Sequence, residues 1–380
     1  MVDLDVLSRN ALSDLAPSIT YVQTSSALTQ DAATHNTSAI QAALNGGNVV
    51  QISGIVPINA TLLIGPALSS VLQGNGNWMW QNSIVGGNGA ALVWMGAAGI
   101  PMVQHQTYFG GSIKNIHFIG DPNNQPSCAI QLTTAASTNV TVNDDDGIFE
   151  NLFIGASYLG THDNSVQFQN GILISGTSNG DTHSFKSIHI KGVAGYAIYN
   201  SNLSANIIKF DTLHINYCAT GIRSNAGMSL ANIYMGTVAG YCFQSDGGNW
   251  DVTGFSSEVS GGLLQVTPAA GGASYTTFVL NNGQFAVVAA NLVSNHYVVD
   301  VTTAAFWRID MTGFTLLYKQ AGAPEAILNF ANPNDGLLYG KYNVDLSAYL
   351  NSHTLSANQN IISGTAQHAT SFLAVSGGGQ

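Results

Sequence analysis

Two acidic residues, Glu150 and Asp211, occupy equivalent positions in a recurring segment of this chain and could work as a catalytic pair. Acid–base chemistry needs one protonated and one ionised carboxyl group. If the segments stack as coils, the two residues lie two coils apart, or about 9–10 Å between backbones. Inverting glycosidases hold their carboxyl groups about 6.5–9.5 Å apart, which leaves room for the attacking water. Lys186 falls between them and would keep one carboxylate ionised.

The same positions have a purely structural interpretation. The full series reads Lys114, Glu150, Lys186, Asp211 and Ala231, so opposite charges alternate along it. Opposite charges on neighbouring strands attract, and the series could be a ladder of salt bridges.

A second equivalent position, three residues further along each segment, carries rings. It reads His117, Phe153, His189, His214 and Tyr234. Aromatic faces pack against the C–H faces of sugars, and polar ring tips can orient them. His117, His189, His214 and Tyr234 are therefore candidate substrate-binding residues, although stacked rings can also simply stabilise a sheet.

A third position reads Gln131, Leu173, Tyr199, Arg223 and Gln244. Tyr199 and Arg223 are candidate substrate-binding residues, because a guanidinium group can bind a carboxylated or acetylated sugar. Arg223 could instead be solvated, or paired with Asp211 or Asp246.

Three acidic residues further along the chain, Asp246, Asp251 and Glu258, form a second-choice catalytic cluster.

The sequence has no phosphate-binding glycine loop and no Cys/His spacing typical of a zinc site, so it predicts neither a cofactor nor a metal.

The segments that carry these positions begin with an apolar residue, continue with two polar or small ones, and then alternate. They are Ile113–Phe118, Phe149–Ile154, Phe185–Ile190, Phe210–Ile215 and Leu230–Met235. Period-two alternation inside a repeat of this length is typical of a coiled parallel β-solenoid, in which equivalent residues stack along one axis. An all-β fold follows.

Composition excludes several kinds of partner. The net charge is −11 at pH 7, with only nine Lys and Arg. Binding to nucleic acid or to an anionic membrane needs clustered cations, so neither is expected as a partner. The three cysteines, Cys128, Cys218 and Cys242, give no sign of a disulfide framework.

Near the N-terminus, Asn36–Gly46 predicts one short helix, with Asn36 or Thr37 as its cap and Gly46 ending it. The strand Val49–Ile52, further strands over Ile55–Ile64 and the turn Leu72–Gly76 follow. This order resembles the start of pectate-lyase-like right-handed β-helices, in the branch of bacteriophage tailspikes and capsule depolymerases. The acidic run that usually precedes the helix is reduced here to Asp31.

The resemblance implies a single-stranded right-handed parallel β-helix whose short helix caps one end. It predicts an N-terminal arm or attachment segment over 1–30, the β-helix over 31–345, and a tail or small trimerisation region over 346–380.

The resemblance also implies a phage tailspike-like depolymerase, a homotrimer in the virion tail, that hydrolyses a bacterial surface polysaccharide (O-antigen or capsule). Such a protein needs no signal peptide, and the acidic start of this chain does not predict one. Two alternatives remain open. One is a lyase that uses His189, Lys191 and Tyr234, and the other is a non-catalytic glycan-binding spike or adhesin.

Overall fold

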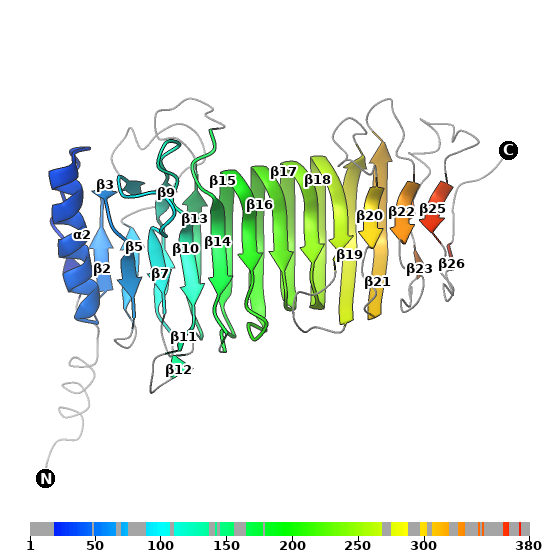
Figure 1. The fold of residues 1–380 in the computed structure, drawn as a ribbon, viewed down its shortest axis with the longest axis horizontal. Helices are drawn as coiled ribbons and strands as arrows, with labels where there is room; N and C mark the ends of the chain where they lie inside the picture. Colours follow the sequence, from blue (N-terminus) through cyan, green and yellow to red (C-terminus); the bar gives the residue numbers. More distant parts are fainter. Residues whose placement is uncertain are drawn as a thin grey trace, which may run out of the picture.

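The chain winds into a right-handed parallel β-helix, with its N-terminal helix at one end (Figure 1). The structure is a computed structural model. It describes residues 19–47, 49–65, 70–74, 89–106, 110–136, 141–142, 145–155, 165–177, 179–267, 275–287, 297–301, 306–318, 326–330, 341–342, 344–345, 360–364 and 372–373. The predicted fold class is confirmed.

Three faces make up each coil. The first face contains β1 (Ile19–Tyr21), β2 (Val49–Ile52), β5 (Val71–Gly74) and β8 (Ser112–Lys114). The second contains β3 (Gly54–Ile58), β6 (Ala90–Trp94), β9 (His117–Ile119) and β24 (Val344–Asp345). The third contains β4 (Leu62–Ile64), β7 (Val103–His105), β10 (Cys128–Thr133), β14 (Asn170–Ser175), β20 (Tyr297–Val301), β22 (Ala326–Phe330) and β25 (Asn360–Gly364).

Longer strands run around a bend from one face to the next. Strands that cover the first and second faces are β13 (Ile148–Ile154), β19 (Tyr275–Val287) and β21 (Phe306–Tyr318). Strands that continue onto the third face are β15 (Ser184–Asn200), β16 (Ile208–Ser224), β17 (Met228–Ser245) and β18 (Gly248–Val266). Two small pairs form separate two-stranded sheets: β11 (Ala135–Ala136) with β12 (Thr141–Val142), and β23 (Lys341–Tyr342) with β26 (Phe372–Leu373).

The bend between the first and second faces recurs at one position in successive coils. It is made by left-handed residues: Asn115, Asn151, Ser187, Thr212, Asn232, Gly254, Asn282 and Gly313. The φ angles of the six that are not glycine lie between 54° and 62°. Asn and Gly tolerate this conformation best, which accounts for six of the eight. Because the eight successive coils from Asn115 to Gly313 bend at the same place, these coils stay in register.

Inside the helix, equivalent apolar side chains stack on one another. The rings of Phe149 and Phe185 are 4.4 Å apart, and those of Phe185 and Phe210 are 4.3 Å apart, in nearly parallel planes. All three belong to one continuous core. Each such pair contributes about 0.5–1.5 kcal/mol beyond the burial of its area.

The capping helix α2 (Gln30–Asn45) begins earlier than the sequence predicted. Thr29, rather than Asn36 or Thr37, is the N-cap and accepts a hydrogen bond from the Ala32 amide. Asn36 is fully buried instead, and its amide group donates to the carbonyls of Ser25 and Pro57. The predicted end at Gly46 is confirmed.

This helix bonds to the exposed edge of the first coil. The Gln41 side chain accepts from the Leu63 amide at 2.7 Å and donates to the Leu63 carbonyl at 3.0 Å. An open sheet edge offers unpaired backbone groups to other chains, so these bonds close a surface that could otherwise aggregate.

Within the segment expected to be an arm, Ile19–Tyr21 forms β1 and pairs with β2. Residues 1–18 of that segment lie outside the described residues. So does the predicted tail 346–380, except for Asn360–Gly364 and Phe372–Leu373.

The three cysteines are all free and buried. Burial raises the pKa of the Cys128, Cys218 and Cys242 thiols to about 12. They remain protonated at physiological pH, where a thiol reacts poorly.

The recurrent bend predicts a stabilising substitution at Thr212, the one β-branched residue among those eight. Thr212→Asn should raise the free energy of unfolding by about 0.5–1 kcal/mol, because Asn accepts positive φ at a lower cost. The matched control is Thr253→Asn, at an extended outward position, which should destabilise slightly through lost strand propensity. Urea denaturation of both variants measures this. Equal effects at the two positions would contradict the argument.

Candidate functional site

The rings predicted at the second position form one continuous row on the outside of the second face. Neighbouring strands pair His117 with Phe153, Phe153 with His189, His189 with His214, and His214 with Tyr234. The ring centroids are 5.0, 5.8, 5.2 and 4.5 Å apart in the same order. Each ring therefore packs against the next. Phe153 and His189 are stacked in nearly parallel planes, whereas His117 meets Phe153, and His214 meets Tyr234, edge to face.

Exposure changes along this row. His117 is 0% exposed and Phe153 is 9% exposed, so a ligand reaches neither in this structure. His189, His214 and Tyr234 are half-buried. The accessible part of the row therefore lies on β15, β16 and β17.

The accessible imidazoles carry no charge at neutral pH. Burial lowers the pKa of His189. Burial, with a smaller contribution from the neighbouring His189, lowers the pKa of His214 to about 4. This stretch of the surface therefore offers no positive charge to an anionic ligand.

The row of rings ends at Tyr234. The next two coils place Ser256 and then Gln284 at the same position, and Gln284 donates a hydrogen bond to the Ser256 hydroxyl at 2.9 Å. The Tyr234 hydroxyl bonds to the Glu258 carboxylate, and burial together with this carboxylate raises the pKa of Tyr234. We call these four residues, Tyr234, Ser256, Glu258 and Gln284, the aromatic step, because a ring stands beside small and polar side chains.

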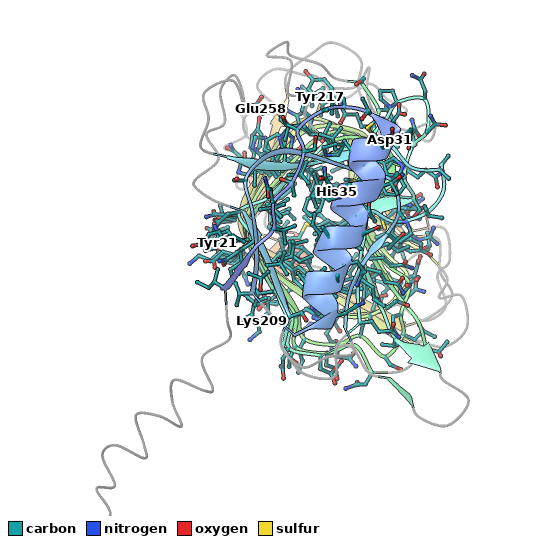
Figure 2. All side chains as sticks on the ribbon, turned by 90° about the vertical axis from the view of Figure 1, so that its left-hand side faces the viewer. Tyr21, Asp31, His35, Lys209, Tyr217 and Glu258 are labelled. Carbon is teal, nitrogen blue, oxygen red and sulfur yellow. The ribbon has the colours of Figure 1, made fainter. Side chains whose placement is uncertain are left out.

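A cation lies near the ring row, at the corner where the second face turns into the third. Lys191 places its Nζ 5.4 Å from the centroid of the Tyr217 ring. Viewed along the axis, Tyr217 and Glu258 both lie at the top of the cross-section and Lys209 at the bottom (Figure 2). His189, Lys191 and Tyr234, the residues of the alternative lyase site, thus belong to neighbouring positions of one face and its corner.

The carboxylate series lies on the first face, just before the bend. Lys186 pairs with Glu150 on one side and with Asp211 on the other. Glu150 is ion-paired with Lys114 at 3.5 Å, whereas Lys186 forms no ion pair with any residue that the structure describes. The alternating ladder is therefore formed at its first step only.

Asp211 is held by neutral donors. Asn232 donates to its Oδ1 at 3.0 Å, and the Thr212 hydroxyl does so at 3.2 Å. Glu150 and Asp211 stand in one outward column with Lys186 between them, two strand spacings or about 10 Å apart along the backbone.

Arg223, at the third position, is already bound. Its Nε donates to the Asp246 Oδ2 at 2.6 Å, and its Nη1 donates to the Tyr196 hydroxyl at 2.7 Å. The guanidinium group also lies 5.4 Å from the ring centroids of both Tyr196 and Tyr199. The pairing with Asp246 that the sequence left open is the one observed.

The second-choice acidic cluster is spread over the molecule. Asp246 is 2% exposed and is bound by Arg223 and Thr267. Asp251 lies near the start of β18, and Glu258 lies beyond the bend at Gly254. The structure brings Glu258 to Tyr234 and does not bring the three acids together.

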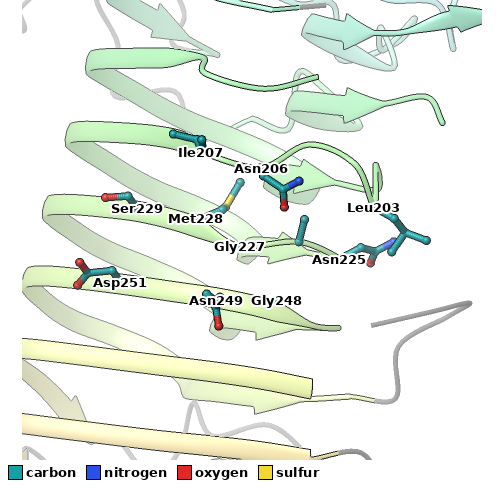
Figure 3. Close-up of a pocket in the computed structure, with 11 residues that line it drawn as sticks. Leu203, Asn206, Ile207, Asn225, Gly227, Met228, Ser229, Gly248, Asn249 and Asp251 are labelled. Carbon is teal, nitrogen blue, oxygen red and sulfur yellow. The ribbon is translucent and has the colours of Figure 1, made fainter. Parts of the chain in front are cut away.

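A groove that the sequence analysis missed opens between the third and first faces. It has a volume of about 560 Å³ and spans three successive coils (Figure 3). The connection from β15 to β16 runs over 201–207, whereas the next two run over 225–227 and 246–247. The longer connection carries Leu203, Asn206 and Ile207, which line one side of the groove and form its wall. Only an alignment of connection lengths could have indicated it.

The described residues offer no group of three or more His, Cys, Asp or Glu that could hold a metal ion. Among them there is also no helix long and apolar enough to cross a membrane.

No family model matches the chain, and no curated protein matches it. Among solved structures, the ORF18 protein of Geobacillus virus E2 aligns with a TM-score of 0.48 at 13% identity, over 90% of this chain and 65% of that protein. An alginate lyase from Paenibacillus sp. str. FPU-7 aligns with a TM-score of 0.35 at 15% identity, over 75% of this chain and 96% of the lyase. This chain thus spans less than two thirds of the virus protein. Both TM-scores are below 0.5, so neither likeness bears on function.

The low pKa of His214 predicts a dependence of stability on pH. An unfolded histidine titrates near 6.5 and the folded His214 near 4. Between these values the unfolded chain binds more protons, so the free energy of unfolding should fall as the pH drops from 6.5 to 4. His214→Phe, a ring already present in the row at Phe153, should lose less stability over this window. Urea midpoints at several pH values measure the difference, and equal slopes would contradict the assignment.

The ion pair between the partly exposed Arg223 and the buried Asp246 predicts that Asp246 is structural. Asp246→Ala leaves the guanidinium group without its partner and should cost about 3 kcal/mol of unfolding free energy. The control, Asp251→Ala, removes an exposed carboxylate and should change stability by less than about 0.5 kcal/mol. Denaturant titration compares the two, and a loss of similar size in both variants would refute the distinction.

Proposed function

We propose that this chain recognises and acts on a bacterial surface polysaccharide, in the manner of a phage tailspike, with the aromatic step as its principal binding site. The observation that carries the proposal is the end of the ring row. Along the row each ring has another ring packed against it on the next coil, but beyond Tyr234 the following coils present Ser256 and Gln284. On the coil next to Tyr234 the short Ser256 side chain takes the place of a ring, which would leave room for a sugar.

The groups at this step match what a sugar offers. An aromatic face packs against the C–H face of a pyranose, and flanking polar groups bond to its hydroxyls. The Glu258 carboxylate can only accept hydrogen bonds, whereas the Ser256 hydroxyl and the Gln284 amide can donate and accept them. Because they stand on a rigid sheet, little ordering is needed on binding.

Electrostatics favours an uncharged or weakly charged polysaccharide. The chain carries a net charge of −11. The accessible imidazoles are neutral, and Glu258 stands at the step itself. A highly anionic glycan would be repelled over most of this surface.

Hydrolysis by Glu150 and Asp211 is a second proposal, favoured by their common outward column. One carboxylic acid would protonate the leaving glycosidic oxygen while the other carboxylate draws a proton from the attacking water. Both residues lie three positions before a ring of the row, in the same coils. A glycan lying along the ring row would therefore run parallel to the column of Glu150 and Asp211, which lies on the other side of the bend between the first and second faces.

The lyase alternative would make Tyr234 or His189 the proton acceptor. Tyr234 gives up its proton less readily than an ordinary tyrosine, because its pKa is raised. This weakens its case as a base, so we favour hydrolysis. A recognition-only spike would need the aromatic step and not the carboxylates.

One experiment separates these functions. Purified protein is incubated with a panel of bacterial capsules and lipopolysaccharide O-chains, and retention, new reducing ends and ultraviolet absorbance of unsaturated uronates are followed. Tyr234→Ala should abolish retention of the polysaccharide. The control Tyr21→Ala removes an exposed ring at the N-terminal end of the β-helix and should keep retention unchanged. Unchanged retention in Tyr234→Ala would exclude the aromatic step.

Cleavage is read in the same panel. New reducing ends without an ultraviolet signal indicate a hydrolase, and Glu150→Gln or Asp211→Asn should then lower the rate at least a hundredfold. Asp31→Asn, an exposed carboxylate on the capping helix, is the control. Full activity in both carboxylate variants would exclude the pair. An ultraviolet signal would instead indicate the lyase, and retention without cleavage the recognition-only spike.

A further inference from the structure

The groove between the third and first faces is lined by both apolar and uncharged polar side chains. Its wall carries Leu203 and Ile207, which are 44% and 54% exposed although both are large and apolar. Exposed apolar side chains are ordinary when single, but two that line one groove indicate a binding surface. The buried side chains of Ala226 and Met228 extend this apolar surface into the groove.

Uncharged polar side chains make up much of the remaining lining of the groove. The side chains of Asn206, Asn225, Asn249 and Ser229 all line the groove (Figure 3). Each can donate and accept hydrogen bonds. The Oδ1 of Asn225 is buried and receives no hydrogen bond from the described residues, which is a costly state for an acceptor. Asn206, Ser229 and Asn249 are exposed, so their polar groups are accessible to a ligand.

The groove contains one charged residue. Asp251 lines it as a carboxylate, and no Lys or Arg does so among the residues described. A carboxylate accepts hydroxyl hydrogen bonds and repels an anionic ligand. Sulfated, phosphorylated or uronate sugars are therefore poor candidates for this site.

The wall is held in place without a ligand. The backbone amide of Asn206 donates to the Asp181 Oδ1 at 2.6 Å, and the backbone amide of Ser204 donates to the Asn202 Oδ1 at 2.9 Å. On the opposite side, Gly227 and Gly248 pack so closely that a Cβ on either would come within 2.4 Å of the backbone of the other coil. A preformed site avoids the entropy cost of ordering its walls on binding.

We propose that this groove is a second carbohydrate site, which binds an uncharged oligosaccharide bearing methyl groups. The methyl groups, from N-acetyl or 6-deoxy sugars, would pack on Leu203 and Ile207. The hydroxyls would bond to the amides, Ser229 and Asp251. The volume of about 560 Å³ lies within the range of small-ligand sites, about 300–1,000 Å³.

This site is independent of the aromatic step. Ser229, in the groove, pairs with Lys209, which lies at the opposite end of the cross-section from Glu258 (Figure 2). One glycan residue cannot touch both. The proposal therefore stands or falls separately from the function assigned to Tyr234.

The test is a titration of the full chain with four trisaccharides, made of N-acetylglucosamine, rhamnose, glucose or galacturonate. Calorimetry gives the affinities, and saturation-transfer NMR identifies the ligand protons nearest the protein. We expect one or both methyl-bearing sugars to bind at least tenfold more tightly than maltotriose, with the strongest transfer to their methyl protons. The two arms separate an N-acetyl from a 6-deoxy ligand.

Variants locate the binding. The double variant Leu203→Asn/Ile207→Asn should weaken it at least tenfold, and both positions are exposed, so the fold should persist. Ile148→Asn, at a site 47% exposed and outside the groove, should leave it unchanged. Equal binding of maltotriose or trigalacturonate, no binding of any trisaccharide, or full binding by the double variant would each overturn the proposal.

Discussion

The fold depends on one constraint, that every coil must pair in register with the next. Parallel pairing puts equivalent residues directly above one another, and a slip of one residue would turn every inward side chain outward. The left-handed bend at Asn115, Asn151 and their equivalents meets this constraint by turning eight successive coils at the same point. The stacked phenylalanines, the ring row and the carboxylate column all follow from it, because each is one position repeated along the axis.

Regular stacking, however, leaves little room for a ligand. In the ring row each side chain packs against its neighbour, and in the core each coil fills the space left by the one before. Openings arise where the repetition breaks. The ring row gives way to Ser256 after Tyr234, and the connection over 201–207 is longer than those that follow it. In this architecture, binding sites are therefore to be sought at irregular positions of the repeat.

The same reasoning explains how far the sequence could be interpreted. Period-two alternation within a repeat was sufficient to place His189, His214 and Tyr234 in one row and Glu150, Lys186 and Asp211 in another, since register alone determines both. The pairing of Tyr234 with Glu258, which is diagonal between strands, could not be predicted in this way. Nor could the groove, which depends on the heights of three connections, or the helix start at Thr29, which depends on the burial of Asn36.

The three buried thiols have a further consequence. None is close to being a thiolate, and none is joined to another, so the cysteines give oxidants and reductants little to act on. The stacked coils are held together by backbone hydrogen bonds and apolar packing, which do not respond to redox potential. The β-helix can therefore form in a reducing environment and remain unchanged when it passes into an oxidising one.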